Sequence, residues 1–142
     1  MTEISILDKL GVDVGYKTTH TKTITETDIV LFAGVSGDFN PVHIAEEYAK
    51  KTMFGGRIAH GIIAVALVSA SVAKLPGLVI LISQSSRFLK PVRIGDTITA
   101  ICEVTAARKD KGIVTLKSTC ANQKGEVVLE GETVVRLYEA PA

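Results

Sequence analysis

Apolar residues in the first half of the chain recur at helical spacing. Thr25 and Asp28 form a capping pattern at the start of one such repeat, which predicts a helix over residues 25–37. A shorter helix is predicted over 45–51. The stretch 61–75 is apolar at nearly every position and is followed by Pro-Gly, so it is predicted to be a buried helix that stops there.

The second half of the chain changes to the alternation that is typical of strands. Ile98, Ala100, Cys102 and Val104 take one face of such a segment, and polar residues take the other. Strands are predicted over 78–90, 97–107, 112–121 and 127–138, with an extended segment over 14–23. Helices followed by strands with short turns predict an α+β fold, a mostly antiparallel sheet wrapped on the apolar helix. No repeat or linker interrupts the chain, so one domain is expected over 1–142.

The helix over 61–75 has no polar face. It carries Ser69, Ser71 and small residues where a helix on an open sheet would be charged. Its far side must therefore be covered, by a strongly curved sheet or by a second subunit.

Composition and charge narrow the class of protein. The chain has 142 residues, 46% of them hydrophobic, and a formal net charge of +1. This balance argues against a disordered chain and against a nucleic-acid binder, which would carry a basic excess. The longest apolar stretch, 61–73, is shorter than the roughly 20 residues of a membrane span. Acidic residues interrupt the N-terminus, so no signal peptide is expected and the cytoplasm is the predicted compartment.

The two cysteines are Cys102 and Cys120, too few for a disulfide framework or a zinc site. Both fall on apolar faces of predicted strands, which favours buried, reduced thiols. If these strands form a hairpin that turns near 109–112, the alternative is a disulfide between them.

Asp38 and His43 lie on either side of a loop that Asn40-Pro41 kinks. A carboxylate and an imidazole brought together can share proton transfer, because the imidazole titrates near neutral pH. The alternative is an aspartate that caps the next segment and a histidine at the surface.

Gly61 opens the apolar helix and leaves its first amides uncovered, so that an oxygen acquiring negative charge could approach them. The alternative is a glycine chosen for close packing. The preceding His60 is interpreted as a hydrogen-bonded structural histidine. The sequence contains no P-loop, GxGxxG, CxxC, HExxH or GxSxG motif, and no metal site is predicted.

The segment SGDFNPVH at residues 36–43, followed by IAHG at 58–61, resembles the signature of MaoC-like dehydratases. More narrowly, it is similar to the short (R)-specific enoyl-CoA hydratases. The likeness extends through the helix after the IAHG segment and through the segments 86–92 and 94–96.

The resemblance implies a hot-dog fold, in which a curved antiparallel sheet holds a long apolar helix. It also implies a homodimer or higher homo-oligomer whose sheets join edge to edge. In such a family Asp38 and His43 would be the catalytic pair, and Asn40 would hold the hydrogen bonds of the site. The Gly61 amide would bind the thioester carbonyl, and Ser69 would also be associated with the site.

The implied reaction is the reversible hydration of a trans-2-enoyl-CoA to an (R)-3-hydroxyacyl-CoA, a lyase reaction of fatty acid metabolism. It would need no metal or redox cofactor, since coenzyme A is part of the substrate. Arg87, Lys90 and Arg93 are candidates for binding its phosphates, or are ordinary solvent-facing charges. The alternatives are a dehydratase acting on an acyl-carrier protein, a partner subunit of a heterodimeric dehydratase, and a non-catalytic acyl-CoA-binding hot-dog module.

Overall fold

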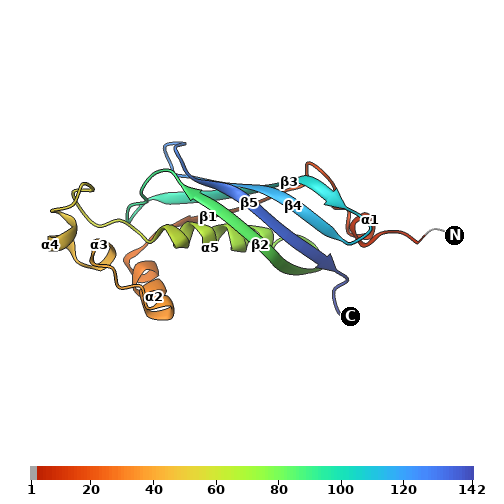
Figure 1. The fold of residues 1–142 in the computed structure, drawn as a ribbon, viewed down its shortest axis with the longest axis horizontal. Coiled ribbons are helices and arrows are strands. Elements are labelled where there is room, and N and C mark those ends of the chain that lie inside the picture. Colours follow the sequence, from red (N-terminus) through yellow and green to blue (C-terminus); the bar gives the residue numbers. More distant parts are fainter. Residues whose placement is uncertain (1–2) are drawn as a thin grey trace.

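A five-stranded antiparallel sheet curves around one long helix, α5 (Gly61–Val72), in the computed structural model, which describes residues 3–142 (Figure 1). The strand order across the sheet is β1-β3-β4-β5-β2. The strands are β1 (Lys17–Thr23), β2 (Leu78–Phe88), β3 (Thr97–Arg108), β4 (Ile113–Ala121) and β5 (Val127–Tyr138). All of the predicted strands are confirmed, and the arrangement is a hot-dog fold.

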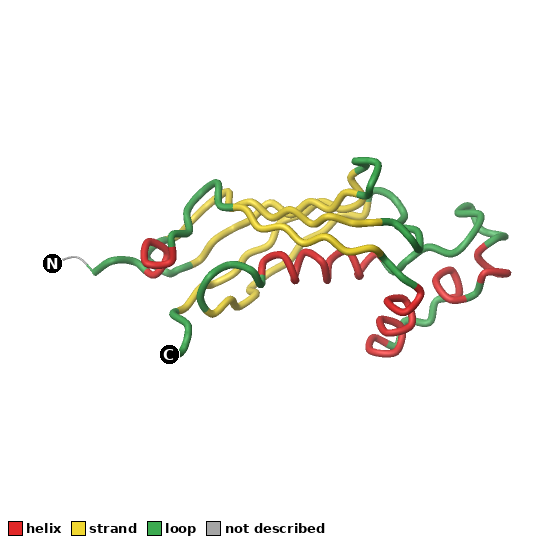
Figure 2. The backbone as a smooth tube through the Cα atoms, turned by 180° about the vertical axis from the view of Figure 1, so that it is seen from behind, coloured by secondary structure: helices red, strands yellow, loops and turns green. Residues whose placement is uncertain are grey.

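The smaller helices cluster beyond the N-terminal end of α5 instead of covering the sheet (Figures 1 and 2). They are α2 (Glu26–Ser36), α3 (Pro41–Ile44) and α4 (Glu46–Ala49), and α1 (Ile6–Leu10) lies at the other end of the sheet. The capping box at Thr25 is present: its hydroxyl accepts from the Asp28 amide, and the Asp28 carboxylate accepts from the Thr25 amide. The prediction of this helix is confirmed.

Helix α3 was not predicted, because Asn40-Pro41 was interpreted only as a break between helices. The Asn40 side chain caps the helix by accepting from the Val42 amide at 3.3 Å. Proline occupies the first helical position, where its missing N–H costs nothing. The dipeptide therefore starts a single turn of helix, and the helix predicted over 45–51 is limited to α4.

The core lies between the inner face of the sheet and α5. Ile98, Ala100, Cys102 and Val104 of β3 are at most 1% exposed, as their alternation predicts, and they form one cluster with α5 residues such as Val68. Such close burial supplies most of the stability of a domain of this size.

Both cysteines are buried and free, so the expectation of reduced thiols is confirmed and no disulfide joins them. Cys120 directs its thiol at the carbonyl oxygen of Ala64 in α5, 3.6 Å away. Burial raises the pKa of the Cys120 thiol to about 12.

We therefore expect neither thiol of the folded protein to react with a disulfide reagent at pH 8. Burial keeps the reagent from both thiols, and the raised pKa of Cys120 leaves that residue almost no thiolate. Titration with Ellman's reagent should detect both thiols only after denaturation. Rapid reaction of the native protein would contradict the buried placement.

The sheet covers only one side of α5. The helix packs mainly on β1 and β3, and its opposite face is open: Ile62 is 50% exposed, and Ala66, Ser69 and Ala73 continue the same stripe. An all-apolar helix can be covered by a curved sheet or by a second subunit, and here the sheet alone does not cover α5. Among residues 3–142, no helix is long and apolar enough to cross a membrane.

Candidate active site

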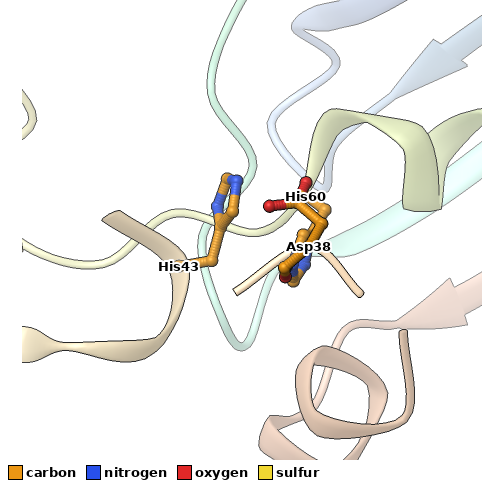
Figure 3. Close-up of side chains that lie close together, drawn as sticks. All are labelled: Asp38, His43 and His60. Atoms are coloured by element: carbon orange, nitrogen blue, oxygen red, sulfur yellow. The ribbon is translucent and has the colours of Figure 1, made fainter. Parts of the chain in front are cut away.

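Asp38, His43 and His60 converge at the N-terminal end of α5 (Figure 3). One side-chain nitrogen or oxygen of each residue lies within 4.8 Å of the other two. They come from three segments: the loop after α2, helix α3, and the residue that precedes α5. The short loop between Asp38 and His43 therefore aims both side chains at one place.

The loop that carries Asp38 is held by its own hydrogen bonds. The Asp38 amide donates to Ser36 Oγ at 3.0 Å, and the Asn40 amide donates to Asp38 Oδ1 at 3.1 Å. Because the Asn40 side chain also caps α3, this residue connects Asp38 to the helix that carries His43. Within residues 3–142, Asp38 Oδ2 has no hydrogen-bond partner, and Asp38 is exposed.

The tautomer of His43 follows from its contact with Ile58. Nδ1 lies 2.8 Å from the Ile58 carbonyl oxygen. A carbonyl oxygen only accepts, so Nδ1 carries the proton and the neutral ring keeps a lone pair on Nε2. His43 is 9% exposed. The ring thus offers a basic nitrogen from a fixed orientation.

Arg57 fixes the backbone of His43 and was not singled out from the sequence. Its Nε donates to the His43 carbonyl oxygen at 2.7 Å, and its guanidinium forms an ion pair with Glu26 at 2.8 Å. The hydrogen bond from Arg57 lowers the pKa of Glu26 below its ordinary value. Arg57 and Glu26 are far apart in sequence, and no local pattern signals their pairing.

Gly61 is the first residue of α5, and among the described residues its amide donates no hydrogen bond. It lines a pocket of about 430 Å³ together with His43. The other lining residues are largely apolar: Phe54, Ile58, Ala59, Ile62, Ala64, Phe88, Leu89, Pro91, Val92 and Val128, with Lys90 at one side. The free amide of Gly61, the ring of His43 and an apolar wall therefore meet in one pocket.

The Phe88 ring packs directly against Gly61. A Cβ atom added at Gly61 would lie 2.8 Å from Phe88 Cδ1, so the ring would have to move. We expect Gly61→Ala to lower kcat/KM for the substrate of this pocket by about 10²-fold, because a small misplacement of the reacting groups is enough. Steady-state kinetics measure this loss.

A double variant, Gly61→Ala with Phe88→Leu, separates two causes. If the displaced ring alone is responsible, the smaller leucine restores activity. If the methyl group itself blocks approach to the amide, the double variant stays impaired, which is the result we expect. Full activity of the single variant would contradict the importance of this close approach.

Ser69 lies eight residues after Gly61, about 12 Å further along the helix. It is exposed on the open stripe of α5 and does not line the pocket that contains His43 and Gly61. The structure of one chain therefore does not bring Ser69 to the cluster, and its role stays a prediction.

The three basic candidates for phosphate binding have different surroundings. Arg87 lies 3.7 Å from Glu130 on the sheet. Lys90 lines the pocket and forms an ion pair with Glu126. Arg93 donates to the carbonyl oxygens of the loop before Ile58, among them that of Phe54 at 2.6 Å. Arg93 therefore braces the pocket wall, and only Lys90 reaches the pocket.

Comparison with known proteins agrees with the geometry. The sequence profile described as the MaoC like domain matches residues 10–124. The chain belongs to this family. It is 49% identical to the (R)-specific enoyl-CoA hydratase of Rhodospirillum rubrum over 116 residues, 80% of each protein. It is 35% identical to a mitochondrial 3-hydroxyacyl-[acyl-carrier-protein] dehydratase of Arabidopsis thaliana, covering 94% of this chain and 82% of that one.

Among solved MaoC-like structures, the (R)-hydratase from A. caviae involved in PHA biosynthesis superimposes with a TM-score of 0.85. The two chains are 39% identical, and the match covers 89% of this chain and 98% of the other. The family and the fold that the motif predicted are therefore confirmed.

Proposed function

We propose that this protein catalyses the reversible hydration of trans-2-enoyl-CoA to (R)-3-hydroxyacyl-CoA. The observation that carries the proposal is the convergence of Asp38 and His43 at the start of α5, where His43 and Gly61 with its free amide line an apolar pocket. The names of the hydratase relatives support the same activity.

The first chemical requirement is to polarise the thioester. The amide of Gly61 can donate to the thioester carbonyl oxygen, which gains negative charge as the reaction becomes enolate-like. The positive end of the α5 dipole reinforces this stabilisation, because Gly61 is the first residue of a 12-residue helix.

The second requirement is to activate water. Within residues 3–142, neither Asp38 Oδ2 nor His43 Nε2 has a partner, and both atoms can accept a hydrogen bond. A single water that donates one hydrogen to each presents its lone pair to the substrate. One member of the pair takes a proton as the oxygen bonds to C3, and the pair returns a proton to C2. No cofactor takes part, since coenzyme A enters and leaves with the substrate.

The apolar walls of the pocket suit the hydrocarbon part of an acyl group, and Lys90 is the candidate for a phosphate of coenzyme A. The direct test is turnover of crotonyl-CoA, followed by the loss of its conjugated enoyl-thioester absorbance. We expect turnover by the wild-type protein. Binding of the acyl-CoA without hydration would instead identify a non-catalytic module.

A second candidate is dehydration of a 3-hydroxyacyl group on an acyl-carrier protein, which the similarity to the Arabidopsis dehydratase favours. The same residues would carry out the chemistry. Comparing kcat/KM for crotonyl-CoA and for a crotonyl-carrier protein distinguishes the two, and a clear preference for the carrier protein would select the second candidate.

The protein is also proposed to act as a homodimer joined through β2. This strand is at the edge of the sheet and exposes large apolar side chains, Leu78, Ile80, Leu81 and Ile82. An exposed apolar strand at the edge of a sheet typically pairs with another chain. The free thiols agree with a reducing compartment, and we propose the cytoplasm.

Light scattering after size exclusion should give at least twice the 15.1 kDa mass of one chain. A charge placed on the edge, as in Ile82→Lys, should shift the protein toward monomers. A monomeric wild-type protein at assay concentrations would contradict the proposed dimer.

A further inference from the structure

His60 contacts both members of the proposed catalytic pair. Its side chain is 2% exposed, and its ring lies 4.0 Å from the ring of His43, centroid to centroid, with 32° between the planes. On another side, the ring of Phe32 from α2 lies 4.7 Å away. His60 therefore lies against α2, the Asp38 loop and α3, and Figure 3 shows it grouped with Asp38 and His43.

The contact with Asp38 is a hydrogen bond to its backbone. His60 Nε2 lies 2.9 Å from the Asp38 carbonyl oxygen. Because the carbonyl only accepts, Nε2 carries the proton and donates. The other ring nitrogen, Nδ1, is buried without a partner among the described residues. A buried acceptor without a partner lowers stability, so packing alone would favour an apolar ring here.

We infer that His60 is a positioning residue that sets the separation between the Asp38 carboxylate and His43 Nε2. The inference rests on the proposed hydratase function. The Nε2 hydrogen bond holds the loop at Asp38, while the face of the same ring supports the imidazole of His43. One rigid side chain thus fixes both ends of the gap in which the water is proposed to bind.

The His60 ring supplies both contacts from one side chain. Phenylalanine would keep a ring against His43 but would leave the Asp38 carbonyl without its donor. Glutamine would keep an N–H donor but would remove the flat surface behind His43. This difference explains why a residue with an unpaired buried nitrogen occupies a position where an apolar residue would pack more favourably.

The test compares His60→Phe and His60→Gln with a matched control, Phe32→Leu. Phe32 packs on the His60 ring, and among the described residues its ring does not pair with that of His43. We expect each His60 variant to lower kcat for crotonyl-CoA by about 10²-fold. The Kd for butyryl-CoA, which fills the pocket without reacting, should change less than about threefold, because the pocket walls are intact.

Phe32→Leu should lower the melting temperature and leave kcat within about threefold of wild type, because it removes packing only. If Phe32→Leu lowers kcat as much as the His60 variants do, the effect is general loosening and the inference is overturned. Folded His60 variants with wild-type kcat would overturn it as well.

A second readout does not depend on turnover. Nitrogen-15 NMR of the imidazoles should show His43 as one tautomer, protonated at Nδ1, in the wild-type protein. His60→Gln should give His43 mixed tautomers or faster proton exchange at Nδ1. An unchanged His43 spectrum overturns the positioning role, whereas absence of turnover in wild type overturns the proposed function instead.

Discussion

Asp38→Asn is expected to lower kcat for enoyl-CoA hydration by about 10²–10⁴-fold, the usual contribution of a positioned acid or base. The asparagine oxygen can still accept from the Asn40 amide, so the loop should keep its shape. The substitution replaces a basic oxygen by an NH₂ group, which cannot accept a hydrogen from water. Steady-state kinetics with crotonyl-CoA measure the loss.

The matched control for this prediction is Asp110→Asn, in the exposed turn between β3 and β4. It makes the same chemical change away from the pocket and should leave kcat unchanged. Thermal unfolding should show that the Asp38 variant is folded. Near-normal turnover by Asp38→Asn would remove Asp38 from the mechanism.

His43→Asn is expected to reduce kcat by a similar factor, about 10²–10⁴-fold, with little change in KM. The asparagine side chain can still donate to the Ile58 carbonyl from the position that Nδ1 occupies. What it lacks is the basic nitrogen at the position of Nε2. Activity should therefore fall while the contacts of α3 are kept.

His20→Asn is the control, because His20 lies on β1 and takes no part in the cluster. It should have wild-type kinetics. A His43 variant with unchanged kcat and a raised KM would show that His43 binds substrate and does not transfer a proton.

Local sequence patterns predicted the elements of this fold well. The capping box at Thr25 and the alternation in β3 depend on neighbouring residues, so the chain itself displays them. Helix α3 was missed because a proline that starts a helix looks, in sequence, like one that breaks it.

The candidate site was only partly visible in the sequence. The sequence indicated that Asp38 and His43 could meet across one loop, because the two residues are close along the chain. The contacts of His60 with Asp38 and of Arg57 with Glu26 depend on how distant segments pack. Ser69 lies on a face of α5 that one chain leaves open, so neither the sequence nor one subunit explains its position.

In the proposed mechanism, Asp38 and His43 direct one water to a thioester held at the start of α5. Chiral analysis of the product formed from crotonyl-CoA by the wild-type protein tests it most directly, using dehydrogenases specific for each 3-hydroxyacyl-CoA enantiomer. We expect (R)-3-hydroxybutyryl-CoA as the product. Absence of hydration, or accumulation of the (S) enantiomer, would contradict it.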